Sequence, residues 1–135
     1  MFNGQLLKRL MAGVVLITPV VSCFAQDDMS SQRGRAIVAN RQVGLCLLCH
    51  SAPIPEERFQ GNLAPNLALL VQGKTSQQLK NMIENPAIDH PGTIMPSYGK
   101  TDHLQRLPQH LRGKVILSNE QIDDVVAYLM SLQKP

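Results

Sequence analysis

Two cysteines and a histidine, Cys46, Cys49 and His50, form the pattern C-x-x-C-H, which occurs once in the chain. On a single helical turn, the three-residue spacing places both thiols on the same side, at a separation that suits the two vinyl groups of a haem. The adjacent His50 then directs its imidazole at the iron. The pattern therefore predicts one covalently bound haem c, with its iron ligated by His50.

Three other kinds of site use similar residues. A dithiol redox site would follow a thioredoxin-like strand and open a helix, whereas a Pro-rich loop begins here at Ser51. A zinc site needs a second pair of ligands, and His90, His103 and His110 lack the required spacing. The short spacing and the adjacent histidine also disfavour a structural disulfide. These comparisons favour haem attachment.

A six-coordinate iron needs a second axial ligand, for which we select Met95. This residue follows His50 by 45 positions and precedes Pro96, which can hold the thioether in place. A Met/His pair raises the reduction potential relative to two histidines, which suits a group that accepts electrons.

Other residues remain alternatives for this ligand. Met82 lies on the apolar face of a predicted helix and Met130 beside the apolar face of another, so we expect both to pack in the core. His90 and His103 lie in loops among polar neighbours, where surface positions are the more usual role.

A further contact is predicted for the loop of residues 61–67, which must return under the haem. The backbone carbonyl of Pro65 is placed to accept the other imidazole N–H of His50. Such a bond would select one tautomer and raise the basicity of the ligand. A plain turn is the alternative interpretation of this loop.

The elements that must position these residues are predicted to be helices. Apolar periodicity indicates a helix over residues 31–40, capped by Ser31, and a short apolar segment covers residues 67–71. Capping boxes at Thr75 and Ser118 indicate two more. Since no strand and no internal repeat is evident, we expect an all-α fold in which long loops wrap one haem.

The N-terminus has the order of a secretory signal peptide. A positive stretch precedes an apolar run over residues 10–21, and Ala25 offers a small residue for cleavage. The run is too short for a membrane span, which needs about 20 residues. We therefore expect a signal peptide over 1–25, a mono-haem domain over 26–135 and a periplasmic location. Cleavage before Cys23, with a lipid on that residue, is the alternative.

Charge and composition narrow the classes of partner. Loss of Lys8 and Arg9 with the signal peptide leaves 11 basic and 10 acidic residues, a net charge of +1. No cluster of basic and aromatic side chains indicates nucleic-acid binding. The rings of the remaining domain are those of Phe59, Tyr98 and Tyr128, so a large apolar prosthetic group would supply missing core.

At these residues the chain resembles class I cytochromes c. The resemblance joins the C-x-x-C-H pattern and the Pro and Met-Pro loops to an early helix with Gly34 and Val38 and a final helix with Val125 and Tyr128. It implies that the terminal helices cross at close contact, with Gly34 and Tyr128 at the crossing. Val38 stands where an aromatic residue is usual.

More specifically, the chain resembles the SoxX family, the mono-haem subunits of SoxXA (SoxAX) cytochromes. The resemblance lies in residues 61–67, 95–98, 111–118 and 123–129. Ala64 departs from it, because a glycine is usual at this position.

The SoxX resemblance implies a role in sulfur oxidation. Complexes of this kind are L-cysteine S-thiosulfotransferases, which oxidatively couple thiosulfate to a cysteine of a carrier protein. The implied partners are a SoxA-like haem subunit in a heterodimer, a SoxYZ-like carrier in transient contact, and a small downstream cytochrome c.

No catalytic residue is predicted in this chain, because both cysteines of the domain are consumed by thioether bonds. We therefore expect an electron-accepting subunit. The alternative is a free soluble class I cytochrome c that serves another respiratory pathway.

Overall fold

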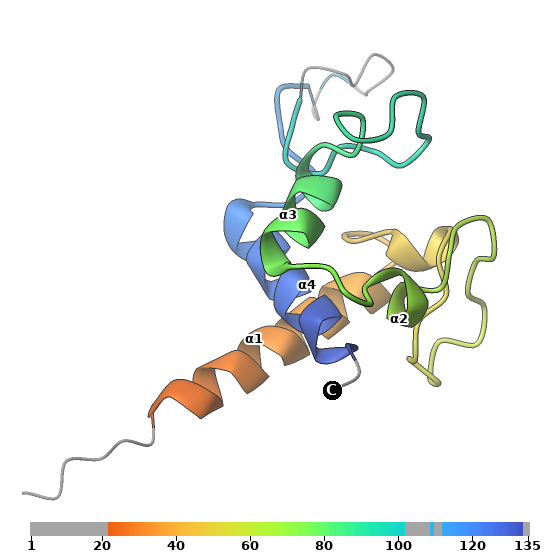
Figure 1. The fold of residues 1–135 in the computed structure, drawn as a ribbon. Coiled ribbons are helices and arrows are strands. Elements are labelled where there is room, and N and C mark those ends of the chain that lie inside the picture. Colours follow the sequence, from red (N-terminus) through yellow and green to blue (C-terminus); the bar gives the residue numbers. More distant parts are fainter. Residues whose placement is uncertain (1–21, 102–108, 110–111, 134–135) are drawn as a thin grey trace, which may run out of the picture.

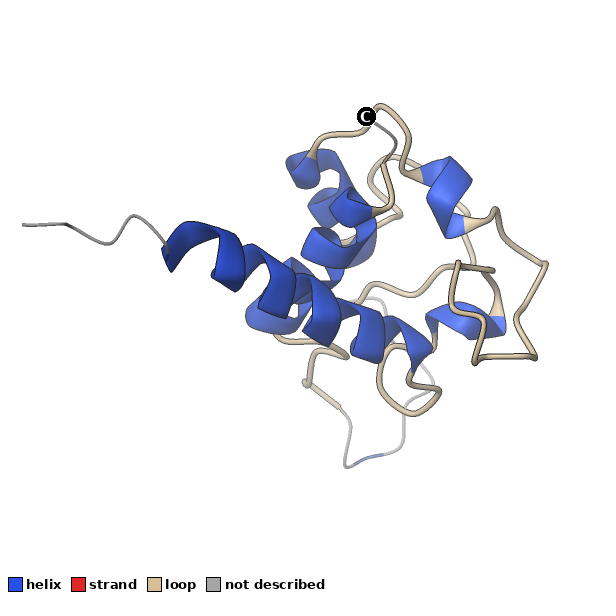
Figure 2. Cartoon of the chain, turned by 90° about the horizontal axis from the view of Figure 1, so that it is seen from below, coloured by secondary structure: helices blue, strands red, loops and turns tan. Residues whose placement is uncertain are grey.

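The computed structural model describes residues 22–101, 109 and 112–133, with side chains from residue 27 onwards. Its elements are the α-helices α1 (Ser22–Ala39), α2 (Leu67–Leu70), α3 (Ser76–Glu84) and α4 (Asn119–Ser131) and one 3-10 turn, η1 (Cys46–Leu48). The described residues contain no strand, as Figure 2 shows. The predicted all-α class I cytochrome c-like fold is confirmed.

Residues 1–21, which make up most of the predicted signal peptide, lie outside the described residues, as do His103 and His110. Across the part of the chain that is described, no helix combines the length and the apolar character needed to cross a membrane.

The terminal helices α1 and α4 cross and pack closely together (Figure 1). Gly34 makes the crossing possible, because a Cβ at this position would lie 1.9 Å from the carbonyl oxygen of Asp124. Arg33 braces the same place with two hydrogen bonds of 2.7 Å to the Asp124 carboxylate. The helices cross as the resemblance implies, but Gly34 faces the backbone of Asp124 and Val125, one turn before Tyr128.

The first helix is longer than predicted. It begins at Ser22 instead of Ser31, since no proline or glycine interrupts residues 22–30. Ser31 is therefore not a cap, and its hydroxyl donates to the Ser131 hydroxyl at 3.2 Å. After the helix ends at Ala39, the Asn40 side chain accepts two backbone N–H groups at 2.8 and 3.1 Å and turns the chain towards η1.

Both predicted capping boxes are present. Thr75 accepts the backbone N–H of Gln78 at 3.2 Å and donates its own N–H to the Gln78 side chain at 2.8 Å. Ser118 and Gln121 exchange the same two bonds at 3.3 and 2.9 Å. Each cap stabilises its helix by about 1 kcal/mol, so the starts of α3 and α4 are locally determined.

The long loop between α3 and α4 is pinned at Tyr98. Its backbone N–H donates to Ile83 of α3 at 3.1 Å, and its carbonyl accepts from Ile116 and Leu117 at 3.0 and 3.1 Å. The two ends of the loop are thereby joined to each other and to α3. The buried core formed by these elements comprises Val38, Leu47, Ala52, Ile54, Leu67, Val71, Leu79, Ile83, Tyr98, Leu117, Ile122, Val125, Val126, Tyr128 and Leu129.

Candidate functional site

The segment from Gly44 to His50 forms a tight turn packed against α1. Gly44 is buried, and a Cβ there would lie 2.1 Å from the carbonyl oxygen of Ile37. Leu45 adopts a left-handed conformation with φ of 59°, which is strained for a side chain of this kind. The Cys46 carbonyl then accepts the N–H groups of Cys49 and His50 at 3.2 and 2.9 Å. One helical turn thus groups both cysteines with the histidine.

Residues 61–67 run alongside this turn and are bonded to it. Three backbone N–H groups of residues 61–67 donate to carbonyls of the turn and of the residue that follows it. The donor–acceptor pairs are Gly61–Leu47, Ala64–Cys49 and Leu67–Ser51, at 2.8, 3.0 and 2.8 Å. Gly61 is required at this approach, because a Cβ would lie 2.3 Å from the Leu48 carbonyl oxygen. Ala64 is not at a positive φ, so the usual glycine is not needed there.

The hydrogen-bonded segment places the Pro65 carbonyl beside His50. The carbonyl oxygen lies 2.7 Å from His50 Nδ1, and since a carbonyl only accepts, Nδ1 carries the proton. The other ring nitrogen, Nε2, is then the unprotonated one, which is the form that ligates a metal. Asn66 supports the loop by donating to the Ser51 hydroxyl at 2.9 Å and by capping α2.

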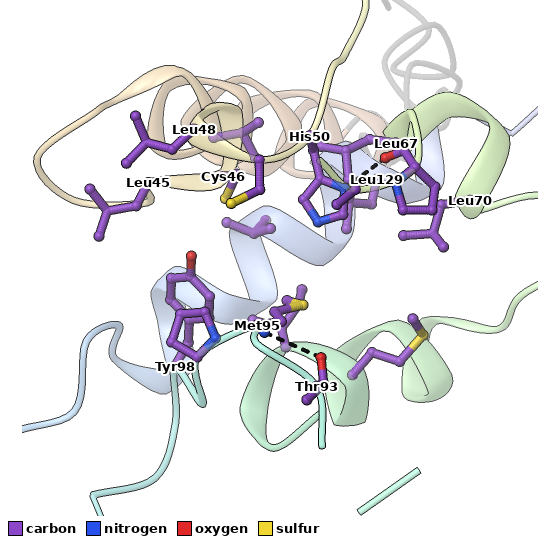
Figure 3. A pocket seen from close by; sticks show the side chains of 18 of the residues that line it. Leu45, Cys46, Leu48, His50, Leu67, Leu70, Thr93, Met95, Tyr98 and Leu129 are labelled. Carbon is purple, nitrogen blue, oxygen red and sulfur yellow. Dashed lines mark hydrogen bonds between the residues drawn. The ribbon is translucent and has the colours of Figure 1, made fainter. Parts of the chain in front are cut away.

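An apolar cavity of about 510 Å³ lies beneath the turn. Residues from α1, α2, α3, α4 and both long loops line it: Val38, Leu45, Cys46, Leu48, Cys49, His50, Leu63, Ala64, Pro65, Leu67, Leu70, Leu79, Met82, Ile83, His90, Thr93, Ile94, Met95, Pro96, Tyr98, Leu117, Val125 and Leu129. Figure 3 shows Cys46 and His50 on one wall and Met95, Thr93 and Tyr98 on the facing wall.

The structure shows where the candidates for the second iron ligand lie, apart from His103, which is outside the described residues. Met95 is half-buried, and its backbone N–H donates to the Thr93 hydroxyl at 3.2 Å, as the dashed line in Figure 3 marks. Met82 and His90 line the same cavity, Met82 from α3 and His90 as an exposed residue of the loop. Met82 was expected to pack in the core, and its half-buried side chain instead lines this cavity.

The described residues offer neither a reactive thiol at Cys46 nor a cluster of zinc ligands. Cys46 and Cys49 are both free, and burial raises the pKa of the Cys46 thiol to about 11, so it is neutral near pH 7. A reactive dithiol needs a lowered pKa instead. Within the described residues, no group of three or more His, Cys, Asp or Glu side chains could hold a metal ion.

The residues present fit a haem. Two thiols on one helical turn line an apolar cavity, and an imidazole nitrogen and a thioether sulfur are offered from facing walls. Nitrogen and soft sulfur donors are the axial ligands of c-type haem iron, and apolar walls accommodate the macrocycle.

Sequence reasoning missed the role of Tyr98 in this site. Its side chain is only 4% exposed, and its hydroxyl donates to the Gly44 carbonyl at 2.6 Å. Burial also raises the pKa of the phenol, which therefore stays protonated and remains a donor. No local signal could reveal this bond, because 54 positions separate the two residues.

Comparisons with known proteins agree with this geometry. The family model described as cytochrome c matches residues 31–133. Among solved structures, a chain of the crystal structure of SoxXA from P. pantotrophus is similar, with 30% sequence identity and a TM-score of 0.66. The match covers 77% of this chain and 82% of that chain. The comparison with curated protein sequences found no match.

Proposed function

Because the chain belongs to the cytochrome c family and is of the SoxX type, we propose that it accepts electrons while a SoxXA-type complex couples thiosulfate to a carrier-protein cysteine. It carries a covalently bound haem c with its iron. A haem supplies one-electron chemistry by cycling its iron between the ferric and ferrous states.

The observation that carries the proposal is the arrangement of Cys46 and His50 across the cavity from Met95, with Cys49 on the same helical turn. The two thiols would hold the haem through thioether bonds, and the His50 imidazole and the Met95 thioether would hold its iron. Pro65 holds His50 in the ligating tautomer through the 2.7 Å hydrogen bond. The apolar walls exclude water and so favour a raised reduction potential.

The assignment of Met95 is tested by Met95→Ala. The variant is expected to lose the methionine-to-ferric charge-transfer band and to have a reduction potential lower by on the order of 0.1 V. Met82→Leu is the matched control, because Met82 also lines the cavity and should leave both properties unchanged. If the two variants exchange these outcomes, Met82 is the ligand.

Three apolar side chains at the rim of the cavity support a haem-bearing partner. Leu48, Leu63 and Ile94 line the cavity and are 51%, 68% and 78% exposed. Exposed apolar groups at an electron-transfer edge suit a partner that stays bound. The described part of the domain contains no cysteine beyond the two assigned to haem, so the carrier cysteine reacts at the SoxA-like partner.

The pathway assignment is tested by reduction of the ferric protein. Thiosulfate and a SoxYZ-like carrier are expected to reduce it only when a SoxA-like subunit is present and co-purifies with it. A stable monomer that ignores this subunit and is reduced by another donor would instead support the free class I carrier. In the proposed pathway, a small downstream cytochrome c should reoxidise the protein after thiosulfate has reduced it.

The N-terminus is part of the same proposal. We assign residues 1–25 to a signal peptide and the working domain to residues 26–135 in the periplasm. The intact mass of the exported protein should equal that of residues 26–135 plus one haem. A mass that includes lipid and begins at Cys23 would contradict cleavage after Ala25.

A further inference from the structure

We propose that the Tyr98 hydroxyl is a positioning group. It connects the segment that carries Met95 (residues 85–101) to the haem-attachment turn (Gly44 to His50). This inference rests on the proposed ligation by Met95. The bond joins two parts of the chain that carry opposite walls of the cavity, and it acts through the Gly44 carbonyl.

The bond is the connection between the two walls. Of the hydrogen bonds within the described residues, only those of the Tyr98 hydroxyl, to the Gly44 carbonyl and to the Cys46 side chain, join residues 85–101 to residues 40–67. Within the part of the chain that is described, the hydrogen bond of Met95 is local and goes to Thr93. Ser97 donates to Asn85 at 3.2 Å, which anchors the segment at the end of α3 but not to the wall of His50.

The acceptor depends on Tyr98 once haem is attached. The Gly44 carbonyl accepts from two side chains, the Cys46 thiol at 3.3 Å and the Tyr98 hydroxyl at 2.6 Å. Thioether formation adds the Cys46 thiol across the double bond of a haem vinyl group, so that an S–C bond forms, the thiol hydrogen moves to the other vinyl carbon, and the S–H donor is lost. Tyr98 then provides the remaining hydrogen bond to a carbonyl of a buried residue, and a buried acceptor without a donor is destabilised.

The same carbonyl belongs to the peptide that leads into the strained Leu45. That residue has φ of 59°, and its conformation sets the direction in which Cys46 and His50 follow. A hydrogen bond on the Gly44 side of this peptide helps to hold the left-handed turn. Tyr98 therefore bears on both walls: on His50 through the turn, and on Met95 through the backbone three residues away.

The test is Tyr98→Phe, which removes only the hydroxyl, with Tyr128→Phe as the matched control. Both tyrosines are 4% exposed, but the Tyr128 hydroxyl has no hydrogen-bond partner within the described residues. The measurement is the affinity of the ferric haem protein for added imidazole, which must displace the methionine segment. We expect about tenfold tighter binding for Tyr98→Phe, the effect of one lost buried hydrogen bond, and less than a twofold change for Tyr128→Phe.

The outcomes separate this inference from the proposed ligation. A wild-type protein without the methionine charge-transfer band would overturn the ligation by Met95 and, with it, this inference. A normal band with equal imidazole affinities in wild type and Tyr98→Phe, or equal effects in both variants, would overturn the inference alone.

If the Tyr98→Phe variant does not accumulate as a haem protein, NMR of the wild-type haem protein tests the hydrogen bond between Tyr98 and Gly44. A slowly exchanging Tyr98 hydroxyl proton with cross-peaks to the Gly44 α-protons is the expected result. A hydroxyl proton that exchanges rapidly and lacks these cross-peaks contradicts the proposal.

Discussion

At the scale of single residues, the orientation of His50 depends on a glycine 11 positions away. Gly61 lets residues 61–67 approach the haem-attachment turn so closely that backbone hydrogen bonds form between them. The Pro65 carbonyl reaches His50 Nδ1 because the bonds made by Ala64 and Leu67 lie on either side of it. A backbone contact therefore favours the tautomer in which Nε2, the nitrogen we propose as the iron ligand, is unprotonated.

Gly61→Ala is expected to push this segment away from the turn, because the new Cβ would lie 2.3 Å from the Leu48 carbonyl oxygen. Overpacking of this kind destabilises a protein by about 1–3 kcal/mol. The reduction potential should also rise, since a less basic imidazole stabilises the ferric ion less. Thermal unfolding and redox titration measure the two effects.

Asn62→Ala is the control for this substitution, because Asn62 is the exposed neighbour of Gly61. Its stability should remain within about 0.5 kcal/mol of wild type. A Gly61→Ala protein with wild-type stability and potential would contradict the account of the Pro65 contact.

At the scale of elements, the crossing of α1 and α4 sets the frame on which the cavity is built. Val38 of α1 and both Val125 and Leu129 of α4 line the cavity, so the two helices supply one continuous apolar wall. Their separation is limited by Gly34, whose missing side chain admits the backbone of Asp124. A wider crossing would move this wall away from the haem-attachment turn.

Gly34→Ala is expected to lower the free energy of unfolding by about 3 kcal/mol, because its Cβ would lie 1.9 Å from a backbone oxygen that cannot rotate away. Chemical denaturation of the haem protein measures the change. Gln32→Ala, on the exposed surface of the same helix, should alter stability by less than about 0.5 kcal/mol. Equal stabilities of the two variants would show that the crossing tolerates a side chain.

At the scale of the whole molecule, the haem is part of the core and not an addition to it. Without it, the walls of a cavity of about 510 Å³ would lose their packing partner. Unfilled apolar space destabilises a core, and the penalty grows with its volume. The fold and the cofactor are therefore thermodynamically coupled.

The double substitution Cys46→Ala and Cys49→Ala removes covalent attachment. In the absence of haem, the chain is expected to lose its cooperative thermal transition, which calorimetry and near-ultraviolet circular dichroism detect. Wild-type haem protein is the reference. A cooperative transition in the haem-free chain would mean that the loops close over the cavity by themselves.

The exposed apolar side chain of Ile94 at the rim of the cavity is expected to contribute to binding of a partner subunit. Ile94→Asp places a charge at the exposed edge and is expected to weaken binding of a SoxA-like subunit at least tenfold, as loss of an apolar anchor does. Ile88→Asp is the matched control, because Ile88 is 72% exposed but does not line the cavity. Titration calorimetry compares the two, and equal affinities would place the interface elsewhere.

The sequence by itself determined the features that depend on near neighbours. The C-x-x-C-H spacing indicates haem attachment because one helical turn groups its side chains, and the capping boxes at Thr75 and Ser118 close within three residues. The predicted start of the first helix at Ser31 was wrong. Ser31 resembles a cap, but the backbone N–H groups that a cap would satisfy are satisfied by the preceding turns of the helix.

Only the tertiary structure decided the contacts between segments far apart in the chain. Gly34 lies against the backbone of Asp124 on the other terminal helix, and the Tyr98 hydroxyl reaches Gly44 across 54 positions. Such pairs depend on where two helices cross and how a loop is pinned, and no local pattern carries that information. The haem-attachment turn is thus determined by adjacent residues, whereas the position of the facing wall depends on tertiary packing.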